Sequence, residues 1–226
     1  MKKLLACMTG ILLLFTGCSV KNENNSSENQ NEQTSPAGAV AEDNNAGADN
    51  SVSDENIIII TLYPDIAPIT CENFETLVSD GFYNGLKFHR VMDNFMAQGG
   101  DPQGTGMGGS ANTIKGEFSA NGVENNLSHQ RGVVSMARSK AYDSASSQFF
   151  ICYADCSSLD GQYAAFGEVT QGMEVVDRFL EVPRSYSGSE LSSPNSPIVM
   201  KEVTMIDPDE NNNPRVQIIM DDFKTE

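Results

Sequence analysis

The strongest restriction on the fold comes from a series of short runs rich in β-branched and aromatic residues, separated by glycine, asparagine, aspartate and serine. Such runs are typical of short strands joined by turns. The predicted strands cover 57–62, 87–92, 132–136, 148–153, 165–170 and 198–206. Two other segments have apolar residues at helical spacing. Many short strands with only two helices indicate a mainly β barrel or sandwich and argue against β-α-β units.

The first helical segment, 70–79, places its apolar residues on one helical face. Thr70 is the predicted N-cap, because its hydroxyl can accept a hydrogen bond from a free backbone N–H of the first turn. Gly81 is the predicted stop, because glycine readily adopts the left-handed conformation that follows many helices. The second segment, 173–180, predicts a shorter helix.

The first 17 residues have the pattern of a signal peptide. Two lysines, Lys2 and Lys3, precede an apolar run over 4–15 that is too short to span a bilayer. The sequence Leu-Phe-Thr-Gly-Cys at 14–18 resembles the bacterial lipobox. This resemblance implies that Cys18 is lipidated, and that the protein is extracytoplasmic and anchored to a bacterial cell membrane. An ordinary secretory signal with an incidental cysteine is the alternative.

The rest of the chain divides by composition. Residues 18–54 contain almost no large apolar side chain and predict a disordered linker, because burial cannot offset the entropy of ordering them. A folded domain is expected over 55–206, followed by a C-terminal extension over 207–226. The chain has 14 basic and 31 acidic residues, a net charge of −17. This charge disfavours nucleic acid as a partner, and we expect a monomer.

Three segments carry the densest combination of polar and apolar groups. They read Phe-His-Arg-Val-Met-Asp-Asn-Phe-Met-Ala-Gln-Gly-Gly-Asp-Pro at 88–102, Ser-Gln-Phe-Phe-Ile at 147–151 and Leu-Asp-Gly-Gln-Tyr-Ala-Ala-Phe-Gly at 159–167. In this order and spacing they resemble the cyclophilin family of peptidyl-prolyl cis-trans isomerases. The segments 104–109 and 131–137 are also similar to a loop and a strand of that family. The resemblance implies a closed eight-stranded antiparallel β-barrel capped by two short helices.

The resemblance also implies an activity and a site. The substrates are proline-containing polypeptides, and no cofactor is needed because no bond is broken. By their positions in the motifs, Arg90, Gln98 and Phe95 are the catalytic residues. The implied substrate-binding residues are Met96, Gly104, Ala137, Arg138, Gln148, Phe150, Leu159, Tyr163 and Phe166. Strand alternation points Phe149 away from this set and into the core.

An arginine suits this reaction. Resonance in the X-Pro bond sets a rotation barrier of about 18–20 kcal/mol. The twisted bond returns a lone pair to the prolyl nitrogen. A guanidinium keeps its proton and can donate a hydrogen bond to that lone pair. Apolar neighbours exclude water and strengthen the interaction. By the resemblance, Arg90 is this donor, and Gln98 would hold the substrate carbonyl.

Other functions receive less support from the sequence. A non-catalytic module that holds extended peptides in the same groove is the main alternative, and a surface adhesin is a weaker one. His89 and His129 are interpreted as structural, because no serine-hydrolase motif accompanies them. Cys152 and Cys156 lack a second ligand pair, so no metal site is predicted.

Several positions depart from the family pattern. Ser158 stands where many members have a tryptophan that contacts cyclosporin, and Tyr163 replaces a common histidine, so weak cyclosporin binding is expected. Arg138 occupies a usual asparagine position. The strand that opens the family barrel is not evident before Ile57. Either residues near Val52 supply it, or 216–220 from the C-terminal extension closes the barrel instead.

Overall fold

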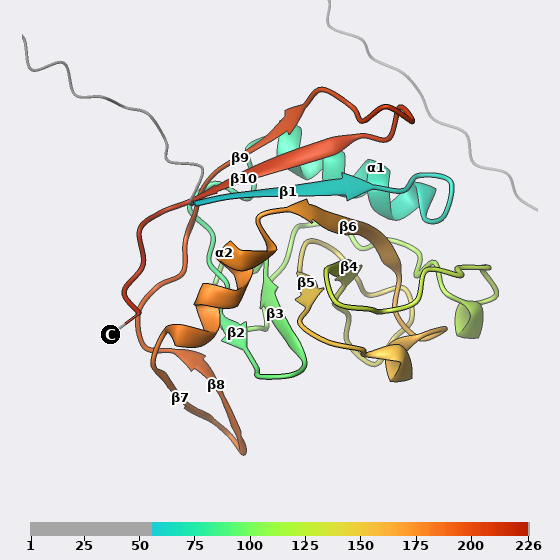
Figure 1. Ribbon diagram of the computed structural model, residues 1–226. Helices are drawn as coiled ribbons and strands as arrows, with labels where there is room; N and C mark the ends of the chain where they lie inside the picture. The colour runs from blue at the N-terminus through green and yellow to red at the C-terminus, as the bar shows by residue number, and fades with distance from the viewer. Residues whose placement is uncertain (1–55, 226) are drawn as a thin grey trace, which may run out of the picture. The chain divides into compact units, whose positions relative to one another are not determined.

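The computed structural model describes residues 56–225 (Figure 1). Eight strands form one antiparallel sheet in the order β2-β3-β5-β4-β6-β1-β10-β9. The strands are β1 (Ile57–Leu62), β2 (Arg90–Val91), β3 (Met96–Gly99), β4 (Val133–Met136), β5 (Phe149–Cys152), β6 (Ala165–Gln171), β9 (Met200–Ile206) and β10 (Arg215–Met220). Of these, β3 is absent from the predicted strands, and β10 was expected only as one of two ways to complete the barrel.

The prediction of a closed barrel is wrong. The sheet is an open, strongly curled half-barrel with β2 and β9 at its two edges. Within the described part of the chain, the segment before β2 meets the start of β9 through an isolated bridge between Lys87 and Val199 and neighbouring backbone hydrogen bonds, such as that from Phe88 to the Ile198 carbonyl. Since β2 has only two residues, this contact does not extend into a continuous ladder between β2 and β9.

The extension over 207–226 contributes to this sheet. Its strand β10 lies between β1 and β9, and Ile57 is opposite Ile219 in the register. Of the two expected ways to complete the sheet beside β1, the structure therefore has the C-terminal strand. Val52, the alternative, lies outside the described residues.

Helix α1 (Pro68–Ser79) begins earlier than expected. The N-cap is Ala67 and not Thr70. Pro68 can occupy the first position of the helix because a backbone N–H there would have no partner within the helix. The predicted stop at Gly81 is confirmed, since Gly81 has φ of +69° and donates its N–H to the Val78 carbonyl. Together with a second bond from Phe82 to Leu77, this forms a Schellman motif.

Helix α2 (Met173–Arg178) continues into a 3-10 turn over Phe179–Glu181, which confirms the second predicted helix. Helix α1 contacts β9, while α2 contacts β1. Between them and the inner face of the sheet lies the main core. Its largest fully buried aromatic side chains are Phe74, Tyr83, Phe88, Phe118, Phe149, Phe166 and Phe179. No helix within residues 56–225 is long and apolar enough to cross a bilayer.

A separate two-stranded hairpin was not predicted from the sequence. It consists of β7 (Arg184–Ser187) and β8 (Glu190–Pro194) and projects below β2 and α2 in Figure 1. Gly188, with φ of +63°, supplies the left-handed conformation that its two-residue turn needs.

Candidate active site

Strand alternation separates the site from the main core. On β3, Ala97 belongs to the main core, whereas Met96 belongs to a second apolar cluster. On β5, Phe149 lies in the main core and Phe150 lies in the second cluster, as predicted. The candidate site therefore occupies the face of the sheet that is turned away from the main core.

A pocket of about 150 Å³ opens on this face, and it is called the apolar pocket because most of the side chains that line it are apolar. Pockets for drug-sized ligands typically have volumes of about 300–1,000 Å³, so this pocket is smaller. Its size suits one small ring. Its lining consists of Arg90, Phe95, Met96, Gln98, Ala137, Arg138, Phe150, Leu159 and Tyr163. All nine residues belong to the set predicted from the sequence.

The Arg90 guanidinium lies at the rim of this pocket. Its Nη1 donates to the Gln98 Oε1 at 3.3 Å and approaches the Met96 Sδ at 4.0 Å. The guanidinium carbon lies 5.8 Å from the centre of the Phe95 ring. On the other side, Nε and Nη2 donate to the two carboxylate oxygens of Glu190, both at 3.0 Å. Arg90 therefore presents one nitrogen to the pocket and is paired through the other two.

Side-chain amides continue the network away from Arg90. The register places Gln98 opposite both Arg90 on β2 and Phe150 on β5. Gln98 Nε2 donates to Gln148 Oε1 at 2.8 Å, and Gln148 Nε2 donates to the Gly108 carbonyl at 2.7 Å. Both ends of the Gln98 amide are therefore held, which directs its carbonyl oxygen towards the guanidinium.

Arg138 forms a rigid wall on the opposite side of the pocket. Its guanidinium carbon lies 4.6 Å from the ring centre of Tyr163 and 5.1 Å from those of Phe118 and Tyr142. Its Nε and Nη2 both donate to the Gln162 carbonyl. Arg138 is therefore a second fixed cation at the edge of the pocket.

Two larger polar cavities adjoin the pocket, and both share Gln98 with it. Gln148 lines the first, of about 320 Å³, together with Gln98, Gly106, Met107, Gly108, Ala137, Arg138, Ser139, Ser144 and Ser146. Gly104 lines the second, of about 430 Å³, together with His89, Arg90, Gln98, Thr105, Gly106, Ser187, Glu190, Ser192 and Ser193. Gly104 and Gln148 are thus close to the site but do not line the apolar pocket.

Phe166 does not belong to the site, and this corrects the expectation from the motif. Its side chain is fully buried in the main core, with its ring centre 5.1 Å from that of Phe74. The physical reason is that Phe166 lies on β6 and points to the inner face of the sheet. Tyr163, in the loop before β6, lines the pocket instead and contacts the Phe150 ring edge to face at 5.9 Å.

His129 has the hydrogen bonds of a serine-hydrolase triad, although no such motif is visible in the sequence. Its Nδ1 lies 2.7 Å from Asp160 Oδ1, and its Nε2 lies 2.9 Å from Ser135 Oγ. Ser135 and His129 are 0% and 1% exposed, so a substrate cannot reach the hydroxyl. The imidazole is stacked near Phe150, with ring centres 6.0 Å apart. The triad therefore supports the pocket from behind, consistent with a structural histidine.

Among residues 56–225, the buried imidazole of His89 and the buried thiols of Cys71 and Cys152 are not set up as a reactive base or nucleophiles. Burial lowers the pKa of His89, an effect only partly opposed by Asp101, so its imidazole favours the neutral form. Burial raises the pKa of the Cys71 thiol to about 12 and also raises that of Cys152, so both thiols stay protonated.

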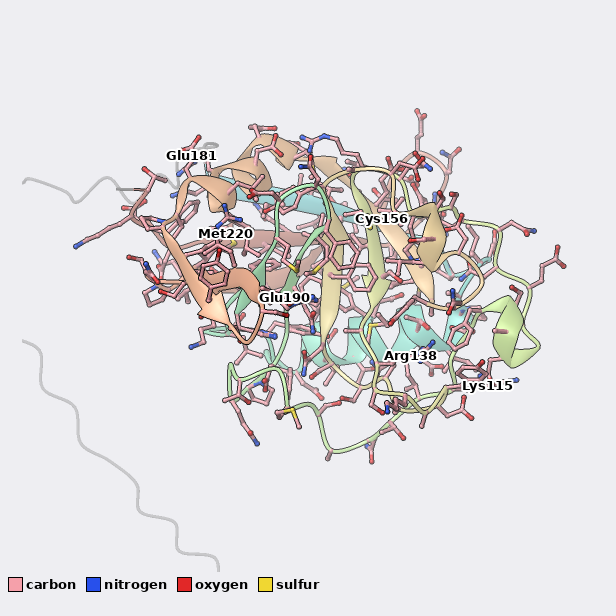
Figure 2. All side chains as sticks on the ribbon, turned by 90° about the horizontal axis from the view of Figure 1, so that it is seen from below. Lys115, Arg138, Cys156, Glu181, Glu190 and Met220 are labelled. Carbon is pink, nitrogen blue, oxygen red and sulfur yellow. The ribbon has the colours of Figure 1, made fainter. Side chains whose placement is uncertain are left out.

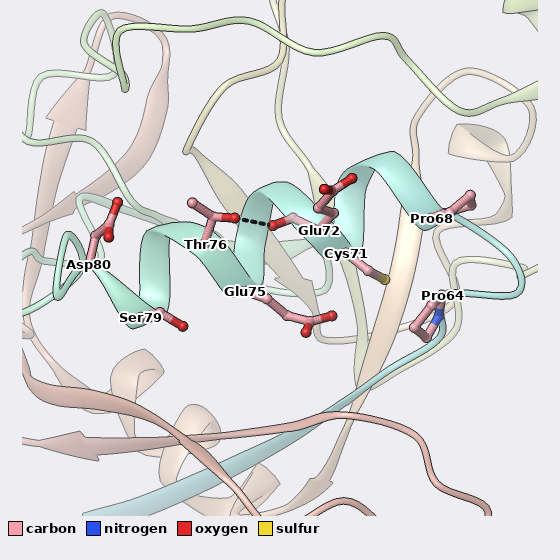
Figure 3. A pocket seen from close by; sticks show the side chains of 8 residues that line it. All are labelled: Pro64, Pro68, Cys71, Glu72, Glu75, Thr76, Ser79 and Asp80. Carbon is pink, nitrogen blue, oxygen red and sulfur yellow. Dashed lines mark hydrogen bonds between the residues drawn. The ribbon is translucent and has the colours of Figure 1, made fainter.

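A separate groove of about 400 Å³ runs along α1 (Figure 3). It is lined by Cys71 together with Pro64, Pro68, Glu72, Glu75, Thr76, Ser79 and Asp80.

Glu190 is the functional residue that sequence reasoning missed. It is 100 positions from Arg90, and no motif connects the two. The available signal was the pair Gly188-Ser189 between two short runs, which is typical of a hairpin turn. Figure 2 shows Glu190 on this hairpin, on the same side of the molecule as Arg138.

Comparison with known proteins gives a consistent result. Residues 48–205 match the family described as cyclophilin type peptidyl-prolyl cis-trans isomerase/CLD. A peptidyl-prolyl cis-trans isomerase of Helicobacter pylori strain 26695 is 46% identical over 125 residues, which cover 54% of this chain and 73% of that relative. The peptidyl-prolyl cis-trans isomerase B of Bacillus subtilis is 46% identical over 123 residues, or 54% of this chain and 82% of that relative.

A solved structure is similar across most of the chain. It is a cyclophilin type peptidyl-prolyl cis-trans isomerase of Cryptosporidium parvum, crystallised in the presence of the dipeptide Ala-Pro. The TM-score is 0.58 and the sequence identity 27%, with 74% of this chain and 99% of that chain covered.

Proposed function

The chain belongs to the cyclophilin-type family of peptidyl-prolyl cis-trans isomerases, and on this basis we propose that it accelerates X-Pro rotation by donating a hydrogen bond from Arg90 to the prolyl nitrogen. The proline ring would enter the apolar pocket of about 150 Å³. Residues flanking the proline would extend into the two polar cavities beside it. This arrangement requires no covalent intermediate.

The proposed catalysis is electrostatic. As the imide twists, the nitrogen loses conjugation and its lone pair becomes an acceptor. Arg90 Nη1 stands at the rim, and the apolar side chains of Phe95 and Phe150 exclude water from the space beside it. A fixed donor in such surroundings stabilises the twisted state more than the planar one, and this difference lowers the barrier. Gln98 would fix the substrate carbonyl while rotation proceeds.

The single observation that supports the mechanism best is the direction of Arg90 Nη1 towards Gln98 and the pocket. The test is the rate of cis-trans exchange in a proline peptide, measured by NMR with the full chain. Arg90→Ala should reduce kcat/KM by about 10²–10³-fold, the usual effect of losing one transition-state donor. The control is Arg131→Ala, which removes an exposed arginine paired with Asp177. Full activity in Arg90→Ala would contradict the mechanism.

A non-catalytic peptide-binding module is the second candidate, supported by the long groove formed by the three adjoining cavities. Titration of the same peptide separates the two functions. Binding without faster exchange in the wild-type protein would favour the module.

We also propose that the substrates are exported proteins and that the enzyme is held at the membrane through lipidated Cys18. The support is the sequence at 1–18, which lies outside the described residues. Metabolic labelling with a palmitate analogue tests this directly. Label on the wild-type chain and none on Cys18→Ser would agree with the proposal, whereas an unlabelled, soluble wild-type chain would contradict it.

A further inference from the structure

We infer that Glu190 is a positioning residue of the isomerase site, because its carboxylate holds the Nε and Nη2 edge of Arg90 and so directs Nη1 into the proline pocket. The inference rests on the function proposed above. It assigns the β7-β8 hairpin to the catalytic machinery, although the hairpin itself lines only the neighbouring polar cavity.

The geometry of the pair supports this assignment. Both carboxylate oxygens are engaged: Nε donates to Oε2 and Nη2 donates to Oε1, each at 3.0 Å, and Nη2 also lies 2.9 Å from Oε2. A bidentate pair of this kind fixes the plane of the guanidinium as well as its position. Glu190 binds the edge of the guanidinium formed by Nε and Nη2, and Nη1 is not part of that edge. Glu190 therefore orients the group without occupying the nitrogen that faces the pocket.

The remaining contacts of Arg90 are too weak to hold this orientation alone. The bond from Nη1 to Gln98 is long, at 3.3 Å, and the contact with Met96 is to a weakly accepting thioether at 4.0 Å. The Phe95 ring centre is 5.8 Å from the guanidinium carbon, near the outer limit of a cation–π contact. The Arg90 side chain is 30% exposed and has several rotatable bonds. Without Glu190 the guanidinium would sample several orientations, and only a fraction would aim Nη1 at a bound proline.

The hairpin is itself attached to the strand that carries Arg90. Arg184 on β7 is only 10% exposed and pairs with Asp93 at 3.1 Å. Its Nη1 donates to the carbonyl of Val91, the neighbour of Arg90 on β2, at 3.3 Å. Ser192 on β8 is 1% exposed, which anchors the other strand. Glu190 thus projects from a fixed support and not from a free loop.

A carboxylate next to a catalytic cation also has an opposing effect, since it offsets part of the positive charge. The exposure of Glu190 and the directional nature of hydrogen bonds make positioning a larger effect on the rate than this loss of positive charge. Glu190 is 41% exposed, so the high dielectric of the surrounding water reduces the effect of its charge in the pocket. Hydrogen bonding to a lone pair depends steeply on direction. The sign of the mutational effect therefore distinguishes positioning from charge compensation.

The test compares Glu190→Ala and Glu190→Gln with the wild-type full chain in the NMR exchange assay. Glu190→Ala should lower kcat about tenfold and leave KM within about twofold, because positioning acts on the twisted state and not on peptide binding. Glu190→Gln, which keeps one acceptor oxygen, should fall between Glu190→Ala and wild type. Glu181→Ala, an exposed carboxylate shortly before the hairpin, serves as the matched control.

Two further measurements separate positioning from a general structural role. The NMR signal of the Arg90 Nε–H, protected by Glu190 in the wild-type protein, should disappear through solvent exchange in Glu190→Ala. In an Arg90→Ala background, Glu190→Ala should cause no additional loss, since the two residues act as one unit. The urea midpoint of unfolding should not change, because both side chains are partly exposed.

The outcomes are distinct. An active wild-type enzyme whose Glu190→Ala variant is equally or more active overturns this inference and leaves the proposed function intact. A wild-type chain without isomerase activity overturns the proposed function, and the inference with it.

Discussion

The carboxylate of Glu117 accepts both the backbone N–H and the hydroxyl of Thr70 at 2.7 Å, at the start of helix α1. It also accepts the N–H of Ile69 at 3.0 Å. The first turn of a helix has free N–H groups and a partial positive charge, and both favour an anion there. Glu117 is 2% exposed and lies 47 positions after Thr70. Since the N-cap residue Ala67 makes no side-chain hydrogen bond, Glu117 caps the helix from a distant loop.

Glu117→Ala should therefore destabilise the fold. It leaves two backbone donors and a hydroxyl without their partner, and we expect a loss of about 2–3 kcal/mol in the free energy of unfolding. Urea denaturation provides the measurement. The control is Glu124→Ala, which removes an exposed carboxylate from the same loop and should cost less than about 0.5 kcal/mol. Equal stability of the two variants would contradict the capping role.

Acid should weaken the loop that borders the site. Burial alone would raise the pKa of Asp101, but N–H groups of Gln103, Gly108, Gly106 and Thr105 bond to its carboxylate and hold the pKa below its ordinary value of 3.8. A lowered pKa means that the unfolded state binds the proton more readily. The stability from this group is therefore present above the ordinary value and is lost as the pH falls through the lowered one.

Unfolding experiments between about pH 6 and pH 3 test this expectation. The free energy of unfolding of the wild-type protein should fall at the acid end, and Asp101→Asn should be less stable at pH 6 but less sensitive to acid. Asp65→Asn, at an exposed position, should keep the wild-type pH profile. An unchanged acid slope in Asp101→Asn would show that this carboxylate is not responsible.

The buried triad should not react as a hydrolase. Ser135 has the hydrogen-bond partners of a nucleophile, but it is 0% exposed. A fluorophosphonate probe should therefore fail to label the folded chain, as measured by intact-mass spectrometry. Labelling that maps to Ser135 would mean that the site opens in solution, contrary to the structure.

Cyclosporin should bind weakly. Ser158 is exposed beside the pocket residue Leu159 and offers no aromatic surface to the drug. Ser158→Trp should tighten binding at least about tenfold in calorimetry, equivalent to roughly 1.4 kcal/mol. Ser157→Trp, at the exposed neighbouring position, should have little effect. A nanomolar dissociation constant for the wild-type protein would contradict the expectation.

Local patterns predicted much of the fold. The run at 57–62 became a buried strand, and Gly81 ended α1, because both depend on residues that are adjacent in the sequence. The lining of the apolar pocket was also predicted, since all of its residues except Ala137 and Arg138 fall within three motifs, and Ala137 ends the similar segment 131–137. Phe166 was misplaced because its motif does not specify the face of β6 from which it projects.

Features that depend on distant partners were not predictable in this way. The half-barrel stays open because β2 is short, and strand length at an edge is decided by the neighbours available for pairing. The ion pair between Arg90 and Glu190 joins two segments 100 residues apart. Neither residue type nor spacing indicates that contact; it arises when the hairpin packs against β2.

The place of β10 in the sheet has a consequence for synthesis of the protein. Of the strands that the structure describes, the first in sequence order, β1, pairs along one side with the last, Arg215–Met220. A nascent chain therefore cannot form this pairing until about 150 residues after β1 have been synthesised. An enzyme proposed to help other chains fold thus depends, for its own sheet, on joining two segments that emerge from the ribosome far apart in time.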